Sequence, residues 1–241
     1  MTIHNFPQGS TAWHRVRCGI PTASNFDKFI TGGTLKLANN ATSRGYRNKL
    51  LAEWLIGKPV EDEYINAYMQ RGTELEDEAR RKYEFIRDVT VEQVGFVLGV
   101  GAGGSPDGLV GDDGMIEIKC YELKHHIGCL LDLDDSHQLQ IQGNLWIADR
   151  QWCDRIYYNP VLPDVTRRVE RDDTTIEAIK LAVGGFKAML TISQAALIEH
   201  DCKPAPPFDA SHYDEYGEPI PPPDDAERLQ AKFNRKESVT A

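Results

Sequence analysis

The sequence predicts an α/β fold in which α-helices flank a mixed central β-sheet. Apolar residues recur at helical spacing through most of the first 90 residues and again over residues 136–148 and 173–199. The segments between them alternate apolar and polar side chains, as strands do. The 241 residues are 41% hydrophobic and 27% charged, which suits a globular chain with a sizeable core. We expect a single domain over residues 1–200 and an acidic, proline-rich tail over residues 201–241.

Three helices are predicted in the first part of the chain. Residues 1–20 should be irregular, because Pro7 and Gly9 interrupt any pattern. Thr22 then caps a short helix that Gly32 and Gly33 end. The other two helices cover residues 43–57 and 72–87. Their apolar stripes, in chain order, are Phe26, Phe29 and Ile30; Leu50, Leu51, Trp54 and Leu55; and Leu75, Ala79, Tyr83 and Ile86.

The middle of the chain is predicted to form the sheet. A strand over residues 91–98 comes first, and a hairpin follows, with its turn at Gly111-Asp112-Asp113-Gly114. Further strands are expected over residues 154–158 and 165–171. A helix should begin at Ser136 and reach Ala148, and a long helix should cover residues 173–199. The proline- and acid-rich residues 203–223 should be extended or poorly ordered.

The formal net charge of −10 does not exclude a protein that binds nucleic acid. Residues 201–225 carry seven acidic residues and one basic residue, so they account for −6 of the −10 and leave −4 for the rest. Clustered carboxylates are also what a divalent metal site requires, and the bound ions offset their charge locally.

Other classes of protein are disfavoured by the sequence. No apolar run approaches the roughly 20 residues of a membrane-spanning helix, and the N-terminus lacks the features of a secretion signal. We therefore expect a cytoplasmic protein with no membrane contact. The five cysteines are scattered, with no C-x-x-C pair of the kind found in zinc and iron–sulfur sites.

The predicted hairpin carries charged residues on an otherwise apolar ladder. Side chains alternate across a strand, so Glu117 and Lys119 should share one face. Asp107, in the bend Pro106-Asp107-Gly108, joins that face if the turn holds three or five residues, whereas a four-residue turn places it on the opposite face. The register decides between these two arrangements.

Two carboxylates beside a lysine match the requirements of phosphodiester hydrolysis. Carboxylate oxygens bind Mg²⁺ or Mn²⁺ while leaving positions for water and substrate. A lysine beside the attacking water can position it and help to deprotonate it. The alternative is a surface hairpin with an ion pair between Glu117 and Lys119.

The segment Ser105-Pro106-Asp107-Gly108-Leu109, followed by Glu117-Ile118-Lys119-Cys120, resembles the PD-(D/E)XK nuclease signature. Its form is that of the lambda exonuclease and YqaJ-type phage recombination nucleases, which have a restriction-endonuclease-like core. Further matches to this family follow in order from residue 13 to about residue 150. They are Trp13 to Gly19 with Thr22-Ala23-Ser24, then Leu50 to Glu53, Arg71 to Arg80, and Gln138-Leu139-Gln140.

The resemblance implies a role for each matching residue. Asp107, Glu117 and the backbone carbonyl of Ile118 would hold Mg²⁺, with two ions expected and Mn²⁺ able to substitute. Glu76 would serve the second ion, and Lys119 would attend the attacking water. Gln138 would orient the water or the scissile phosphate. The alternatives are an ordinary helix glutamine at position 138 and, for Glu76, an i, i+4 ion pair with Arg80 on its own helix.

A phosphate pocket is expected near the N-terminus. The first N–H groups of the helix capped by Thr22 have no internal partner and attract anions. Ser24 and Arg17 could add a hydroxyl and a guanidinium to that helix end. The family resemblance assigns this pocket to the 5′-terminal phosphate of DNA. The alternative is simple capping, with Arg17 on the surface.

The family also implies an activity and an assembly. We expect a 5′→3′ exonuclease that digests one strand of duplex DNA from its end to mononucleotides, for phage-type homologous recombination in the host cytoplasm. A ring-shaped homotrimer and a single-strand annealing protein are the expected partners. The alternatives are a same-fold nuclease of other polarity, an endonuclease, or a non-catalytic DNA-end-binding or assembly subunit.

Overall fold

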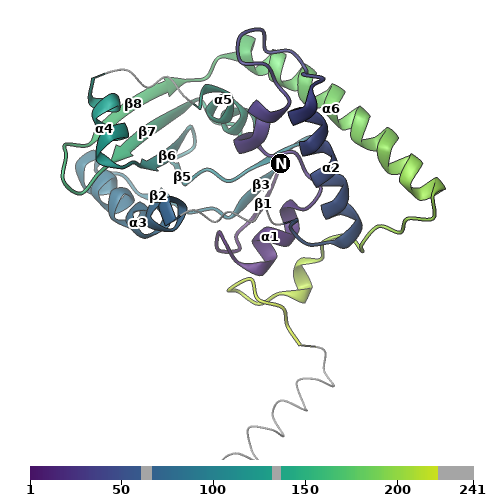
Figure 1. Ribbon diagram of the computed structural model, residues 1–241. Helices are drawn as coiled ribbons and strands as arrows, with labels where there is room; N and C mark the ends of the chain where they lie inside the picture. Colours follow the sequence, from purple (N-terminus) through teal and green to yellow (C-terminus); the bar gives the residue numbers. More distant parts are fainter. Residues whose placement is uncertain (61–66, 132–136, 222–241) are drawn as a thin grey trace, which may run out of the picture.

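The computed structural model describes residues 1–60, 67–131 and 137–221 and contains a mixed five-stranded sheet (Figure 1). Strands β6 and β7 run parallel, and the other neighbouring pairs run antiparallel. The predicted mixed central sheet is therefore confirmed. In sheet order the strands are β2 (Val91–Glu92), β5 (Gly108–Val110), β6 (Gly114–Cys120), β7 (Trp152–Tyr158) and β8 (Val165–Glu170).

The structure also contains a second, three-stranded sheet that the sequence analysis did not predict. It comprises β1 (Thr2–His4), β3 (Phe96–Leu98) and β4 (Gly103–Gly104). The single strand expected over residues 91–98 is thus two strands in two different sheets. The chain crosses between the sheets at Gly95, where a Cβ atom would lie 2.1 Å from the Phe6 carbonyl oxygen.

The N-terminal segment is ordered, so the expectation of an irregular stretch over residues 1–20 is wrong. Besides β1 it forms helix α1 (Thr11–Arg17), whose N-cap Ser10 accepts a hydrogen bond from the backbone N–H of Trp13. Pro7 and Gly9 belong to the turn that leads into this cap, where Gly9 has a φ of +87°. These breakers therefore mark the start of a helix.

The helices cover both faces of the five-stranded sheet (Figure 1). Helix α3 (Ala67–Arg87) packs on one face, where Ala79 and Tyr83 contact Ile116 and Ile118. Helix α5 (Gln138–Ile147) packs on the other face, on the side of Met115. Even- and odd-numbered residues of β6 therefore face different layers, as the period-two pattern predicted.

The main core joins helices from distant parts of the sequence. Phe29 stacks on Phe186 with ring centroids 4.1 Å apart, and Tyr46 stacks beside both. These rings connect the N-terminal segment to α2 (Ala41–Ile56) and α6 (Asp173–Glu199). Gly57 ends α2 in the left-handed conformation, as its position predicted.

Three helical predictions need correction. The element after Thr22 is a six-residue 3₁₀ helix, η1 (Ala23–Lys28), and the Thr22 side chain makes no capping hydrogen bond. Ile86, expected to face inward, is exposed at the end of α3. The predicted helix start at Ser136 lies outside the described residues, and within them the helix begins at Gln138.

Helix α6 contradicts the statement that no apolar run has membrane-spanning length. By length and composition this 27-residue helix is apolar enough to cross a membrane, and 22% of its most apolar stretch is buried inside the protein. A core helix of a soluble protein passes the same test. Ile176, Ile179 and Phe186 pack into the main core.

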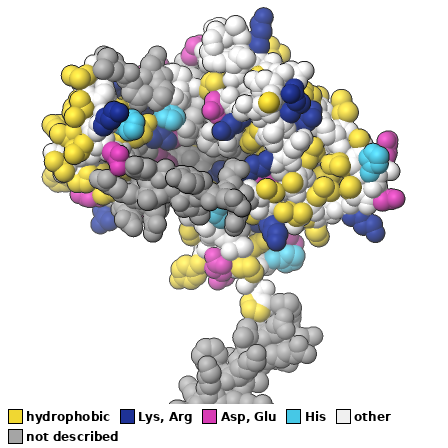
Figure 2. Space-filling view, in the orientation of Figure 1, with side chains coloured by type: hydrophobic (Ala, Val, Ile, Leu, Met, Phe, Trp, Pro, Cys, Tyr) yellow, Lys and Arg dark blue, Asp and Glu magenta, His cyan; other side chains and the backbone are white. Residues whose placement is uncertain are grey.

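Helix α4 (Leu123–Leu130) is an element that the sequence analysis did not predict. His126 and Cys129 are buried toward the sheet, whereas Leu123 and Ile127 face solvent. Figure 2 shows hydrophobic side chains gathered at the left edge of the molecule, where α4 lies in Figure 1. The apolar residues Leu123, Ile127 and Leu130 recur at helical spacing on the exposed side of α4.

The described part of the tail, residues 203–221, packs against the N-terminal segment. The backbone N–H of Ala12 donates to the Gly217 carbonyl at 2.8 Å, and the Thr11 hydroxyl donates to Glu218 at 2.9 Å. Phe208 makes edge contacts with His4 and Phe6. Of the two alternatives expected for residues 203–221, extended or poorly ordered, the structure agrees with an extended chain, which these contacts hold and which contains one short 3₁₀ helix, η2 (Ala210–His212).

Candidate active site

The β5–β6 hairpin places Asp107 beside Glu117. Val110 pairs with Gly114, so the turn holds three residues, and Gly108 pairs with Ile116. The backbone N–H of Asp107 donates to the Ile116 carbonyl at 3.2 Å. Of the two arrangements left open by the sequence, the structure has the one that brings Asp107 to the face of Glu117.

Asp107 is fixed by a second contact with β6. Its Oδ2 atom accepts a hydrogen bond from the backbone N–H of Ile118 at 2.6 Å. Because the N–H and C=O of a strand residue point to the same edge, the Ile118 carbonyl also lies on the Asp107 side of β6. The carboxylate and this carbonyl are the two oxygen donors that the family resemblance pairs at one ion.

The bend before Asp107 is held by the N-terminal segment. Trp13 on α1 donates from Nε1 to the Gly95 carbonyl at 3.0 Å and to the Ser105 hydroxyl at 3.1 Å. The Gln8 amide donates to the Pro106 carbonyl at 3.3 Å. These bonds explain structurally why a tryptophan in α1 belongs with the motif 90 residues later.

Glu117 is the most enclosed carboxylate of the cluster, with 3% of its surface exposed. Its Oε1 atom accepts hydrogen bonds from Lys119 Nζ at 2.8 Å and from Gln140 Nε2 at 2.6 Å. Its Oε2 atom is buried and has no hydrogen-bond partner among the described residues. A buried anionic oxygen without a partner is costly, and a cation would satisfy it.

Gln140 is a site residue that the sequence analysis missed. It lies in the first turn of α5, two positions after Gln138, and its amide reaches Glu117 across the space between helix and sheet. Gln138 is the first residue of that helix, and its role stays a prediction. The segment Gln138-Leu139-Gln140 carried the signal, but the choice between the two glutamines depends on how α5 is rotated.

Glu76 on α3 forms the ion pair that was the alternative interpretation for it, and its role at a second metal ion stays a prediction. It forms the predicted ion pair with Arg80, with Oε1 2.7 Å from Nη2. Its charge also acts on the hairpin carboxylates, because Glu117 and Glu76 both raise the pKa of Asp107. Three carboxylates from two elements therefore converge at this end of the sheet.

This convergence shifts the protonation of the carboxylates. Burial is the largest cause of an Asp107 pKa well above its ordinary value, followed by repulsion from Glu117 and Glu76. The Lys119 ammonium and the Ile118 N–H oppose the shift. Burial likewise raises the pKa of Glu76, against the opposing effect of Arg80. The neighbouring cations, Lys119 and Arg80, therefore only partly offset the negative charge of the three carboxylates.

Lys119 is held in its charged form. Burial by itself lowers the pKa of the ammonium, but Glu117 and Asp107 outweigh burial and raise it above its ordinary value. In this arrangement Lys119 donates a hydrogen bond to Glu117. Its Nζ atom therefore lies beside a carboxylate that would bind a metal.

The residues fit a small divalent cation bound mainly by oxygen and water. The described residues contain no group of three or more His, Cys, Asp or Glu side chains arranged to hold an ion. Mg²⁺ does not need such a group, because it commonly takes one or two carboxylates and keeps several waters. Asp107, the Ile118 carbonyl and the unsatisfied Glu117 Oε2 provide that set.

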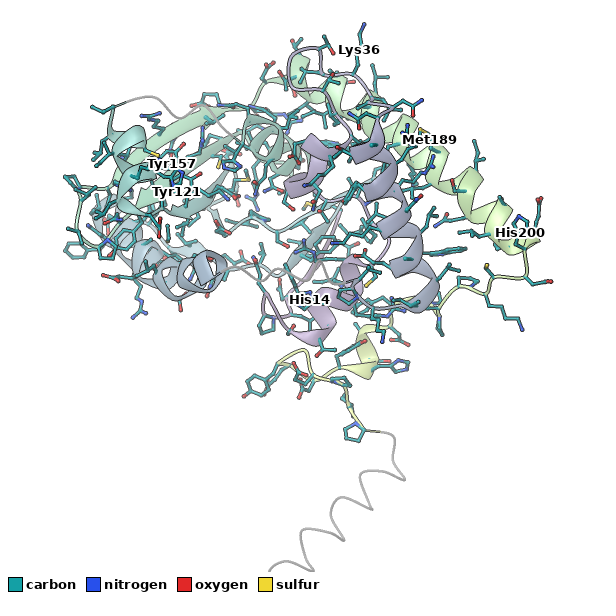
Figure 3. All side chains as sticks on the ribbon, viewed as in Figure 1. His14, Lys36, Tyr121, Tyr157, Met189 and His200 are labelled. Carbon is teal, nitrogen blue, oxygen red and sulfur yellow. The ribbon has the colours of Figure 1, made fainter. Side chains whose placement is uncertain are left out.

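Two tyrosines, Tyr121 and Tyr157, lie near each other at the end of the β6–β7 pair (Figure 3). The rings of Tyr121 and Tyr157 have centroids 5.9 Å apart, and the Tyr121 hydroxyl lies 3.1 Å from Nε2 of His137. His137 precedes α5 with a positive φ of 68°. The contact ties the end of β6 to the start of the helix that carries Gln140.

The expected phosphate pocket is altered by the structure. The guanidinium of Arg17 stacks on the Trp13 ring, 3.8 Å from its centroid, and burial lowers the pKa of Arg17 to about 10. Arg17 is therefore half-buried and still cationic at neutral pH. Ser24 is exposed, with its hydroxyl 3.3 Å from that of Thr22. The helix-end argument is weakened because η1 is a short 3₁₀ helix, and phosphate binding by Arg17 and Ser24 stays a prediction.

Comparisons with known proteins agree with this geometry. The family model described as the YqaJ-like viral recombinase domain matches residues 12–151, which include Trp13, the hairpin and α5. A comparison with curated protein sequences found no match.

Two similar solved proteins are described as exonucleases. The alkaline exonuclease LHK-Exo from Laribacter hongkongensis is 35% identical, with a TM-score of 0.69 over 78% of this chain and 96% of that chain. A second structure of that protein, in complex with dAMP, matches equally well. A phage-related exonuclease from Haemophilus somnus 129PT is 16% identical, with a TM-score of 0.57 over 75% of this chain and 96% of that chain, and shows the fold alone. The fold is restriction-endonuclease-like, as expected.

We predict that Asp107→Asn stabilises the metal-free protein. Asparagine keeps the acceptor for the Ile118 N–H and removes one of three repelling carboxylates. The folded-state pKa of Asp107 is raised, so its favourable contribution exists below about pH 4 and is lost as the pH rises through the folded-state value. The melting temperature in EDTA should therefore rise by a few degrees at neutral pH.

The pH dependence is the control for this prediction. The difference in melting temperature between Asp107→Asn and wild type should be small near pH 4 and should widen as the pH increases. A variant that is less stable than wild type in EDTA at neutral pH would contradict the repulsion among the carboxylates.

We also predict different effects for the two glutamines of α5. Gln140→Ala should lower turnover by about tenfold or more, because Glu117 loses a donor that orients it. Gln138→Ala is the matched variant from the same helix turn. Single-turnover rates on a linear duplex would compare the two variants. A larger loss of rate for Gln138→Ala than for Gln140→Ala would contradict this prediction and would favour Gln138 as the glutamine of the active site.

Proposed function

Since this chain belongs to the YqaJ-like viral recombinase family, we propose that it is a metal-dependent 5′→3′ exonuclease that digests one strand of duplex DNA from its end. The family and the 35% identical alkaline exonuclease support a recombination-related nuclease. Polarity, metal and products are the parts that we propose.

One observation carries the proposal. Asp107, Glu117 and Lys119 meet on one face of the hairpin, and the buried Glu117 Oε2 has no hydrogen-bond partner among the described residues. A hairpin built only for stability would not gather repelling carboxylates around an unsatisfied oxygen. Phosphodiester hydrolysis uses such a cluster, because cations there stabilise the charge on phosphate.

We assign the site residues to two roles, metal binding and orientation of the reacting groups. Asp107, Glu117 and the Ile118 carbonyl would hold Mg²⁺, and Glu76 would reach a second ion, with Mn²⁺ able to substitute. When bound, the metal polarises the phosphate and acidifies a water. Lys119 orients the water through its ammonium, and Gln140 holds Glu117 in place. Gln138 could contact the water or the scissile phosphate from the helix end.

The proposed product and partners are those that the family resemblance implies. The structure of LHK-Exo with dAMP supports release of mononucleotides. We propose double-stranded DNA ends as substrate, bound through a 5′-phosphate at Arg17 and Ser24. We further propose a homotrimeric ring, which would explain processive digestion, a single-strand annealing protein as partner, and the cytoplasm as location.

The second candidate is a nuclease of the same fold with other polarity or with endonuclease activity. Both use the same carboxylates and lysine, so the site does not separate them. A non-catalytic DNA-end-binding subunit is disfavoured, because binding alone does not require carboxylates that repel phosphate.

End-labelled duplexes test the proposed function. With Mg²⁺, a duplex labelled at one 5′ end should release labelled mononucleotide from the first turnover, whereas a 3′ label should remain on long products until late. EDTA should stop both reactions. Early loss of the 3′ label would contradict the polarity, and rapid cutting of a closed circle would indicate an endonuclease.

Lys119→Ala provides the catalytic control in the same assay. Its turnover should fall about 100-fold or more while duplex binding, measured by anisotropy, survives. Near-normal cleavage by this variant would remove Lys119 from the mechanism.

A further prediction concerns the 5′-phosphate. A 5′-hydroxyl duplex should be degraded more slowly than its 5′-phosphorylated counterpart, and Arg17→Ala should reduce the difference, because the guanidinium can bind two phosphate oxygens. Initial rates on the two duplexes measure this preference. Equal rates with wild-type protein would refute the pocket.

A further inference from the structure

Arg80 on α3 is a buried cation next to the proposed metal site. It has 7% of its surface exposed, whereas the following residue, Arg81, is exposed to solvent. A buried guanidinium is retained only where its charge and its donors are satisfied. Its partners therefore indicate what it does.

The guanidinium contacts two carboxylates, one backbone carbonyl and the Gln93 side chain, whose amide oxygen, when turned toward Arg80, accepts from Nη1 at 2.7 Å and from Nη2 at 3.0 Å. Nη2 lies 2.7 Å from Glu76 Oε1, and Nη1 lies 2.5 Å from Asp77 Oδ1. Nε donates to the backbone carbonyl of Asp107 at 3.4 Å, a longer bond that crosses from α3 to the bend of the hairpin. Arg80 thus contacts both the helix carboxylate and the backbone of the hairpin carboxylate.

One turn further along α3, Tyr83 anchors the helix to the sheet. Its hydroxyl donates to Asp154 Oδ2 on β7 at 2.8 Å, and Arg168 binds the same carboxylate through two bonds of 2.8 and 2.9 Å. Tyr83 therefore fixes the position of α3, which leaves Arg80 to set the local distance between Glu76 and Asp107.

We propose that Arg80 is a positioning residue that holds the Glu76 carboxylate at a fixed distance from Asp107, so that both can serve the same metal site. This inference rests on the proposed function. The planar guanidinium suits the task, because its fork binds a carboxylate and a carbonyl at once in a rigid geometry. A lysine would keep the charge but not the simultaneous contacts.

Metal binding in the absence of DNA tests the inference. Isothermal titration with Mn²⁺ would be run on wild type, Arg80→Lys, Glu76→Gln and the double variant. Arg80→Lys should weaken Mn²⁺ binding about tenfold, as loss of a residue that orients a ligand commonly does. Because Arg80 acts through Glu76, the double variant should bind no more weakly than Glu76→Gln alone.

Arg81→Lys is the matched control from the same helix. Arg81 is exposed and its Nε donates only to the Asp77 backbone in the described contacts, so this variant should bind Mn²⁺ like wild type. Melting temperatures in EDTA would show whether each variant is folded. If Arg80→Lys does not fold, Arg80→Gln, which keeps hydrogen-bond donors without the charge, takes its place in the same comparison.

The outcomes separate this inference from the proposed function. Arg80→Lys with wild-type Mn²⁺ affinity, or an effect that adds fully to that of Glu76→Gln, would overturn the role of Arg80 alone. Wild-type protein that binds no Mn²⁺ would overturn the metal-dependent function as well.

Discussion

The three-residue turn between β5 and β6 is the constraint on which the candidate site depends. Gly111 enters the turn at a φ of +53°, where a side chain would be strained, and a Cβ atom at Gly114 would lie 2.2 Å from the Trp152 ring. Lengthening the turn by one residue would move Asp107 to the opposite face of the sheet. The register thus decides whether the Asp107 side chain lies on the same face of the sheet as Glu117.

The site departs from the rules that stabilise the rest of the domain. Elsewhere on β6, Ile116 and Ile118 are buried among apolar side chains, whereas Glu117 on the same strand is buried with an unsatisfied oxygen. Lys119, Arg80 and Gln140 offset part of the repulsion among the carboxylates without removing it. Such locally destabilising groups are expected at a binding site for a cation, because function there takes precedence over stability.

Local pattern explains what the sequence could predict. Alternation along β6 was enough to bring Glu117 and Lys119 to one face, because it depends on the strand alone. The turn length, the rotation of α5 that selects Gln140, and the pairing of β1 with residues 96–98 depend on contacts distant in sequence. The order of residues 203–221 likewise comes from contacts of Phe208 with His4 and Phe6, which no local pattern records.

The electrostatics of the site link the binding of metal and DNA. Without cations, Asp107, Glu117 and Glu76 would repel a phosphate, and the chain as a whole is acidic, with a net charge of −10. On the proposed function, divalent ions reverse the sign of the site, so they must strengthen DNA binding there. Linkage then requires that DNA strengthen metal binding by the same factor. The repulsion among these carboxylates would therefore make phosphate binding at this site conditional on the metal.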